Sequence, residues 1–544
     1  MMKPYRSVIR SALLKYIALS LAVTALFFSN GTAQDRLMVG FTEKQSLSSL
    51  AISKEWKSKG MGQLFWPLVY DLLWYMGPAP DYSPLPGIAD RWETDDHQTW
   101  RFFLNEYAQF SDEIPVTAAD VAFSLKLFLS RKDGWNPRGI TIKSMTELDT
   151  QTLEVTLLEP HSGRYPPFYQ IPILPRHFWK KYERQPETYQ NRLAVGSGAY
   201  FVIEFKPGEI LRLGLNRKHS GHGARWNEVV FLSFKNEKAL HGAMLSGMID
   251  MFGAQGLDPG LVNEFNEARG IRAVVTEGLD LYWLSFNLAK NGPIRKHSVR
   301  QAIMAGIDRE EIISRLYDGY ATAANSFVYP ELTGYHPDLK SYPFDQQKAS
   351  RLLEQAGYSD FNGDGMRDDP SSRQDLTVSL LVVNNDLKQI QIARYIKKHL
   401  NRLGISVDTM QVNNQAYINF LNNPFESGHD LALGHFAPGP YQDWIWNMMR
   451  SDEDFYSQHN YSNYINYAFD RIYDRLLTTS RLDRKIKYQR LVQQIMAEDL
   501  PYGVLIRPYT ICPLNVSKIR EPVVSMGGIS SEINLWNYIY PIEG

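Results

Sequence analysis

Residues 376–412, LTVSLLVVNNDLKQIQIARYIKKHLNRLGISVDTMQV, contain the pattern that decides the fold. The apolar run at 376–383 predicts a buried strand, and Asp386 can cap the helix that follows it. Apolar positions recur at helical spacing in that helix, Gly404 suits a left-handed exit, and residues 405–412 predict another strand. A strand, a helix and a strand in this order predict a parallel βαβ crossover.

In a unit of this kind, ligands bind beyond the carboxyl end of the strand. Here that end is followed directly by Asn384 and Asn385. We therefore expect both amide side chains to contact a ligand.

Strand-like and helix-like segments alternate on both sides of this unit, which favours an α/β fold. Two helix starts also have an acid three residues after a capping residue, at Thr117 with Asp120 and at Asp308 with Glu311. We expect strands at 35–42, 152–158 and 229–234, a β-hairpin at 92–104, and helices after Thr117, at 237–245 and within 296–318.

The composition is that of a large globular protein. With 544 residues the chain is long enough for three or four domains of about 150 residues each. Its 58 Lys and Arg nearly balance 59 Asp and Glu, so there is no global electrostatic case for nucleic-acid binding. Cys512 is the only cysteine, which excludes an intrachain disulfide and a multi-cysteine metal site.

The first 33 residues are typical of an export signal. A basic segment without acids precedes the apolar run at 16–28, and small residues stand at Gly31 and Ala33. We expect cleavage after Ala33 and an exported, periplasmic protein; an uncleaved membrane anchor is the alternative. No cysteine lies near the cleavage point, so we do not expect a lipoprotein.

An exported hydrolase is the rival class, and its signatures are missing from the sequence. We find no G-x-S-x-G, no H-E-x-x-H and, after residue 33, no S-x-x-K, and Ser197 lies between glycines that do not complete a nucleophile motif. His219 and His222 are close enough in the sequence to share a metal, with His241 downstream, but histidines among glycines in a loop are more often a solvated surface. We therefore expect no enzyme, no catalytic residues and no cofactor.

Residues 360–365, DFNGDG, with Asp368 follow the first part of a calcium-loop pattern. The twelfth position, which should be a bidentate glutamate, is Ser371. An Asx-rich turn without bound metal is the better interpretation.

Seven further segments occur in an order that resembles the family 5 extracellular solute-binding proteins, the peptide- and nickel-type receptors of bacterial ABC importers. The resemblance spans nearly the whole chain after residue 33, and the Gly363-Asp364-Gly365 turn recurs in this family at the same place. The segments are 85–93, 102–104 with 110–121, 173–177, 195–200, 286–287, 299–309 and 345–357.

The resemblance implies an α/β, two-lobe periplasmic-binding-protein fold of type II, in its large three-subdomain variant, with mixed sheets flanked by helices and a hinge. It implies a discontinuous lobe I at 34–62, 197–284 and 509–544, an inserted subdomain at 63–196, and lobe II at 285–508. It further implies capture of a peptide-like solute without chemical conversion, delivery to the permease subunits of an ABC importer, and a monomer.

One departure from the family bears on the ligand. In peptide-binding members a tryptophan-led loop of lobe II carries an acid that pairs with the ligand's α-amino group. The corresponding stretch here is 433–440, with Phe436 near the tryptophan and Gly439 near the acid. Either Asp443, four residues later, takes the charge role, or the ligand has no amine there.

Residues 441–467 are rich in aromatic side chains, which pack cores but also stack on peptide side chains or sugar faces. We expect Trp444 or Trp446 to line the ligand site. An oligosaccharide would suit the aromatic residues and the missing acid, and it remains the alternative solute.

Overall fold

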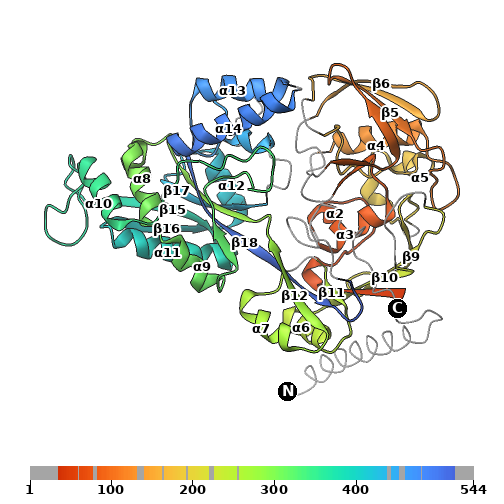
Figure 1. Cartoon of the computed structure of the whole chain (residues 1–544), viewed down its shortest axis with the longest axis horizontal. Helices are drawn as coiled ribbons and strands as arrows, with labels where there is room; N and C mark the ends of the chain where they lie inside the picture. Colours follow the sequence, from red (N-terminus) through yellow and green to blue (C-terminus); the bar gives the residue numbers. More distant parts are fainter. Residues whose placement is uncertain are drawn as a thin grey trace, which may run out of the picture.

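A mixed sheet of twelve strands runs through the whole computed structural model (Figure 1). The structure describes residues 35–58, 60–77, 83–131, 140–161, 165–191, 194–219, 226–253, 256–437, 443–451, 460–479 and 481–520. Along the sheet the strands follow the order β16-β15-β17-β13-β18-β11-β1-β10-β9-β8, and β12 and β14 pair with β18. Their bounds are β1 Arg36–Thr42, β8 Tyr200–Lys206, β9 Ile210–Leu215, β10 Glu228–Phe234, β11 Met251–Phe252, β12 Ile271–Glu277, β13 Leu281–Phe286, β14 Ala321–Ala323, β15 Thr377–Val383, β16 Ser406–Val412, β17 Leu431–Phe436 and β18 Tyr502–Asn515.

Strand β18 joins the two halves of this sheet. Its first part pairs with β13 and β14, and its second part pairs with β12 over seven residues, from Tyr509 to Asn515. The chain crosses a second time in the short segment between β12 and β13. Figure 1 shows β18 passing from the green and blue half of the molecule to the half that contains β11 and β1.

The half built on β13 to β17, here lobe II, has helices on both faces of its sheet. One face carries the hydrophobic core under α8, α9, α10 and α11, and the other carries the cores under α12, α13 and α14. The bounds are α8 His297–Gly306, α9 Arg309–Leu316, α10 Gln346–Gln355, α11 Leu387–Asn401, α12 Asn414–Asn422, α13 Tyr467–Thr478 and α14 Leu482–Asp499.

The predicted βαβ crossover is confirmed. β15 and β16 pair in parallel over seven residues, with α11 between them in the chain. The Asp386 carboxylate accepts the Gln389 N–H at 3.0 Å, and Gly404 has a φ of +76°. Ala393, Ile396 and Leu400 are buried as expected, whereas Ile390 is only half-buried and Ile392 takes its place in the core.

The other half, here lobe I, is built on β1, β8 to β12 and the second part of β18. The strand at 36–42, the strand at 228–234 and the helix at 237–245 agree with the sequence-based expectation. Asn236 caps that helix by accepting the Ala239 N–H at 3.0 Å. The helices of this lobe are α2 Glu55–Ser58, α3 Gly60–Val69, α6 Glu237–Leu245 and α7 Val262–Glu267.

A separate four-stranded antiparallel sheet, in the order β4-β5-β7-β6, lies within the predicted insertion. The hairpin expected at 92–104 is confirmed as β4 paired with β5. At the start of α4 the Asp120 carboxylate accepts the backbone N–H of Thr117 at 2.9 Å. The bounds here are β2 Trp74–Met76, β3 Pro84–Pro86, β4 Ala89–Glu93, β5 Thr99–Leu104, β6 Ile142–Glu147, β7 Thr152–Leu157, α4 Ala118–Leu129 and α5 Arg176–Trp179.

Short 3₁₀ turns complete the secondary structure, and none of the described helices has the length and apolar character needed to cross a bilayer. The turns are η2 Glu43–Gln45, η3 Lys180–Tyr182, η4 Pro186–Thr188, η5 Pro259–Leu261, η6 Pro293–Arg295 and η7 Asp443–Met449.

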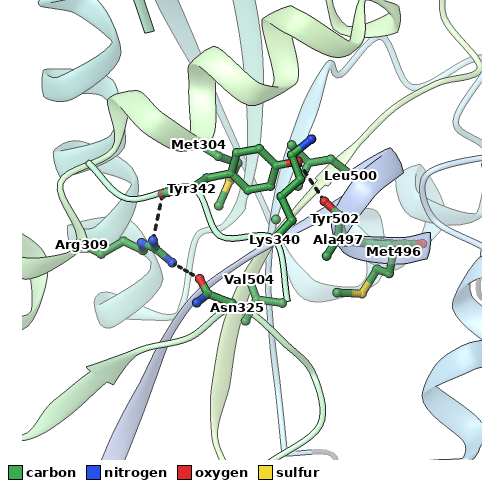
Figure 2. A pocket seen from close by; sticks show the side chains of 11 residues that line it. Met304, Arg309, Asn325, Lys340, Tyr342, Met496, Ala497, Leu500, Tyr502 and Val504 are labelled. Carbon is green, nitrogen blue, oxygen red and sulfur yellow. Dashed lines mark hydrogen bonds between the residues drawn. The ribbon is translucent and has the colours of Figure 1, made fainter. Parts of the chain in front are cut away.

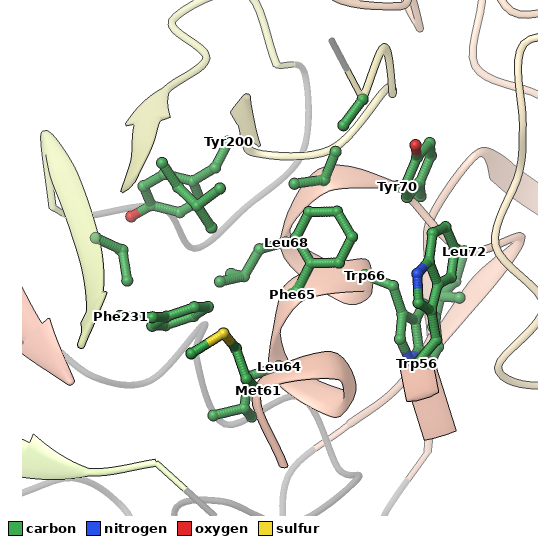
Figure 3. Close-up of a cluster of buried hydrophobic side chains, with 14 of the residues drawn as sticks. Trp56, Met61, Leu64, Phe65, Trp66, Leu68, Tyr70, Leu72, Tyr200 and Phe231 are labelled. Carbon is green, nitrogen blue, oxygen red and sulfur yellow. The ribbon is translucent and has the colours of Figure 1, made fainter. Parts of the chain in front are cut away.

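Lobe I and the insertion share one continuous hydrophobic core. Helix α3 packs at its centre, where Phe65 and Tyr70 contact Trp56 (Figure 3). Lobe II has its own cores, and the division falls between Leu279 and Leu281 and again between Ile506 and Ile511. The sequence places these boundaries after residues 284 and 508; β13 packs with lobe II because it pairs on both sides with β17 and β18.

The Asx-rich turn at 360–368 is confirmed by its hydrogen bonds. The Asp360 carboxylate accepts the N–H groups of Gly363 at 2.6 Å and Gly365 at 2.9 Å, and Asp368 accepts that of Phe361 at 2.7 Å. These bonds lower the pKa of the Asp360 carboxyl. The carboxylates thus satisfy the turn's own backbone.

Two glycine variants test how tightly the chain before β8 packs against α3, with Gly242 as the control. A Cβ on Gly198 would overlap the carbonyl oxygen of Leu68, whereas a Cβ on Gly242, inside α6, would meet no atom within 4 Å. We expect Gly198→Ala to destabilise the protein by about 1–3 kcal/mol through overpacking. Gly242→Ala should stabilise it by about 0.5–1 kcal/mol, because alanine loses less backbone entropy in a helix. Denaturant unfolding measures the free energy of unfolding of both variants. Equal changes in the two variants would contradict the prediction.

Candidate functional site at the junction of the lobes

Strand directions bring two sheet edges to face each other at the junction. β17 is antiparallel to β13 and β13 is antiparallel to β18, so β17 and its parallel neighbour β15 run along β18 toward lobe I. β11 is antiparallel to β18, so β1 and β10, which are parallel to β11, run toward lobe II. The carboxyl ends of both sets of strands therefore meet where the lobes meet, the position at which α/β proteins bind ligands.

Asn384 and Asn385 lie at this edge in lobe II. Both are exposed, directly after β15, and the Asn384 N–H donates to the carbonyl oxygen of Val412 at 2.8 Å. Their position is the expected one. Their contact with a ligand stays a prediction.

An aromatic cluster fills the same edge on the α12–α14 face of the sheet. It comprises Trp283, Phe327, Phe436 and Tyr461, which we call the hinge aromatic cluster. The Phe436 ring lies 5.7 Å from Trp283 and stacks on Phe327 at 5.6 Å, while Trp283 stacks on Tyr461 at 6.3 Å. Trp283 and Phe327 are buried, whereas Phe436 and Tyr461 keep part of their surface exposed. The cluster can therefore offer ring surface at the junction.

Trp446 differs from what the sequence suggested. Its side chain is 0% exposed and packs in the core under α13 and α14, so it offers no face to a ligand in this structure. The physical reason is its place in η7, which lies over that core. Asp443 and Trp444 begin the same turn, but their side chains lie outside the described residues, as does Gly439.

His435 lies at the same edge and was not selected as a candidate from the sequence. Its ring stacks on Tyr282 with centroids 4.4 Å apart, and its two nitrogens lie 3.1 Å from Asp280 and 3.9 Å from Asp386. The β13–β17 register places Tyr282 opposite His435, so the pair depends on residues 153 positions apart. In the sequence His435 stands directly before the candidate Phe436. Only the strand register shows that its partner is Tyr282.

Two glutamates lie close together where the chain crosses between the lobes. Glu277 ends β12, opposite Tyr509 of β18, and its carboxyl hydrogen-bonds to that of Glu331. Burial, together with this hydrogen bond, raises the pKa of Glu277 to about 7. The Glu277 carboxyl therefore keeps its proton up to near-neutral pH.

The histidines considered for metal binding and the serine considered as a nucleophile have other partners. His219 Nε2 lies 3.0 Å from the Asp71 carboxylate, and the Ser197 hydroxyl accepts the Asp71 N–H at 3.3 Å. His241 stacks on Phe252, and His222 lies outside the described residues. In the part of the chain that the structure describes, no three His, Cys, Asp or Glu side chains are arranged to hold a metal ion.

Comparison with known proteins identifies what this arrangement is similar to. The sequence model of the family described as bacterial extracellular solute-binding proteins, family 5 middle, matches residues 83–457. The oligopeptide-binding protein AppA of Bacillus subtilis is 25% identical over 430 residues, covering 76% of each chain. The periplasmic oligopeptide-binding protein OppA of Salmonella typhimurium is 26% identical over 449 residues, covering 76% of this chain and 77% of OppA.

The solved structures confirm the two-lobe fold. The structure of AppA from Bacillus subtilis in complex with a nonapeptide superposes with a TM-score of 0.69 at 20% identity. It covers 93% of this chain and 99% of that one.

The glutamate pair predicts a pH dependence of stability. Because the folded pKa of Glu277 is about 7 and its ordinary value is 4.5, the folded state binds this proton more tightly than the unfolded chain. The free energy of unfolding should therefore fall as the pH rises from about 4.5 to about 7. Glu277→Gln should flatten this slope, measured by denaturant unfolding across the range.

Glu354→Gln is the matched control. The Ser350 hydroxyl and Arg367 lower the pKa of Glu354, so it titrates below this window and its loss should leave the slope unchanged. An identical slope in wild type and Glu277→Gln would contradict the prediction.

Proposed function

The chain belongs to family 5 of the bacterial extracellular solute-binding proteins, and we propose that it captures a peptide-like solute between its lobes and delivers it to an ABC importer. The observation that carries this proposal is the meeting of two sets of strand carboxyl ends at a junction, which the described chain crosses between β12 and β13 and along β18. A solute held there contacts both lobes at once and so favours their closure.

The relatives support a peptide-like solute. Two of them are named as oligopeptide-binding proteins, and the structure with a TM-score of 0.69 holds a nonapeptide. At the junction of this chain, exposed amides at Asn384 and Asn385 can hydrogen-bond to a peptide backbone, and Phe436 offers ring surface to a side chain.

An oligosaccharide is the second candidate, favoured by the same rings. Aromatic faces stack on sugars as well as on peptide side chains. In addition, the loop after Phe436 has Gly439 where peptide-binding members carry the acid for the ligand's amine. Under this alternative, Asp443 has no charge partner in the ligand.

Location and partners complete the proposal. A periplasmic position is supported by relatives named as periplasmic, and residues 1–33 supply the export signal that is then removed. The receptor works as a monomer that docks on permease subunits. The family consists of binding proteins rather than enzymes, and we propose no chemical step on the solute.

Recovery of the natural solute tests the function. Protein exported to a bacterial periplasm, purified gently and then denatured, should release peptides that mass spectrometry identifies. Returning those peptides to solute-free protein should reduce the radius of gyration in X-ray scattering, because closure brings the lobes together. Released oligosaccharides would favour the second candidate, and an unchanged radius with bound solute would contradict capture between the lobes.

Variants at η7 separate the two solutes. If the solute is a peptide with a free amine and Asp443 pairs with it, Asp443→Asn should cost about 3–5 kcal/mol of binding free energy. If it is a sugar stacked on Trp444, Trp444→Ala should do the greater harm, about 2–4 kcal/mol. Calorimetry with the recovered solute measures both.

Exposed residues elsewhere provide the controls for these variants. Asp408→Asn on β16 and Tyr107→Ala, whose ring is 71% exposed, should bind like wild type. Wild-type affinity in Asp443→Asn and Trp444→Ala alike would show that this loop does not touch the solute.

A further inference from the structure

Arg507 lies on β18 at the crossing between the lobes, and no described side chain forms an ion pair with it. The residue is 4% exposed, and its Nε is buried without an acceptor. Among the described residues no hydrogen bond or ion pair reaches its guanidinium, which lies over the ring of Tyr329 at 4.3 Å. A cation–π contact satisfies none of its N–H donors in the guanidinium plane.

Other buried arginines of lobe II show what a structural arginine looks like in this protein. Arg309, 7% exposed, donates to the carbonyl oxygens of Ala324 and Tyr342, each at 2.9 Å, and to Asn325 at 3.0 Å. These bonds lie beside a small cavity of about 10 Å³, the space of roughly one water (Figure 2). Arg300 likewise donates to four backbone carbonyl oxygens. Buried donors are normally satisfied in this way, so Arg507 is an exception that requires an explanation.

The register shows which way Arg507 faces. Ile506 stands opposite Tyr282, and the next residue, Arg507, stands opposite Thr322 of β14. Because side chains alternate along a strand, Arg507 and Tyr282 lie on opposite faces of the sheet. Arg507 therefore shares its face with Trp283 and the hinge aromatic cluster.

The nearby acids do not neutralise Arg507 by an ion pair. Glu277 and Glu331 hydrogen-bond to each other, and both attract Arg507 without forming an ion pair or hydrogen bond with its guanidinium. The remaining titratable groups that act on Arg507 are the phenols of Tyr329 and Tyr335. A buried cation without a contacting anion is costly, so an anion bound at Arg507 would lower that cost.

We propose that Arg507 binds a carboxylate of the captured solute, through the paired N–H groups of its guanidinium. The proposal rests on the proposed function and extends it: the solute carries a carboxylate, either the C-terminus of a peptide or an acidic side chain. The planar fork of an arginine matches a carboxylate with two parallel hydrogen bonds. Rings of the hinge aromatic cluster would then contact the adjoining part of the solute.

A competition experiment on the full-length protein tests this inference. The probes are a tetrapeptide library without Asp or Glu as free acids, the same library amidated, and an amidated library with one Glu. Equal amounts are mixed with solute-free protein, and the bound fraction is isolated by gel filtration and quantified by mass spectrometry. Wild type should retain the free acids, the Glu library or both at least about tenfold over the amidated library. The library that is retained identifies the source of the carboxylate.

Arg507→Gln should abolish this preference, and Arg507→Lys should keep part of it, since lysine supplies charge without the fork. Arg373→Gln is the matched control: that arginine also lies over a ring, Phe361 at 3.9 Å, but stands near the amino end of β15. It should bind like wild type.

Thermal unfolding without solute separates this role from a structural one. Removing an unpaired buried charge should leave the melting temperature of Arg507→Gln unchanged or raised. A lowered melting temperature with an unchanged preference for carboxylates would overturn the proposal.

A second probe covers the case in which no peptide is retained. Glutarate, compared with its diamide at equal ionic strength, should raise the melting temperature of wild type but not of Arg507→Gln. A glutarate shift in wild type alone, together with no retained peptide, would reject peptide capture and support the carboxylate site. Equal shifts in both proteins would overturn the carboxylate site itself.

Discussion

The rest of the structure depends on one strand that belongs to both lobes. β18 pairs with β13 and β14 in lobe II and then with β12 in lobe I, so its hydrogen bonds hold the lobes in one sheet. At the crossing the ladder is weakest, because Pro508 has no N–H to donate. Gly278 of the second crossing passes so close that a Cβ there would overlap the Pro508 carbonyl oxygen. Rotation between the lobes is therefore confined to a few residues, while the ladders on either side remain intact.

Two contacts limit how far this crossing can move. The Tyr329 hydroxyl donates to the carbonyl oxygen of Leu279, and the Tyr509 N–H donates to that of Tyr320 at 3.0 Å. The first bond joins Tyr329 of lobe II to the segment between β12 and β13. The second joins Tyr320 of lobe II to the part of β18 that enters lobe I. The same short region holds the Glu277 carboxyl, whose pKa is raised to about 7. Backbone hydrogen bonds and titratable side chains thus lie together at the crossing between the lobes.

The sequence predicts local elements well and the site only in part. The βαβ unit at 376–412 was predictable because its spacing, its cap at Asp386 and its exit at Gly404 are local signals. Family resemblance supplied the two lobes, and strand direction explains why Asn384 and Phe436 reach the junction. His435 and Arg507 could not be predicted, because their surroundings come from strands far apart in the chain. Trp446 shows the opposite error, since a tryptophan in an aromatic run packs a core as readily as it lines a site.

Arg507 lies on the strand that crosses between the lobes, so the proposed binding residue and the hinge are in the same place. A carboxylate held by this side chain would be bound by the strand that crosses the hinge, within the face that carries the aromatic rings. Any rotation about the crossing changes the distance from Arg507 to the edge of lobe I, where β1 and β10 end. A solute that spans this distance contacts Arg507 and lobe I together only in the closed arrangement, so its differential affinity for that state is the closing free energy. A charge at the hinge that no ion pair neutralises is consistent with this coupling, because the solute would supply the missing contact.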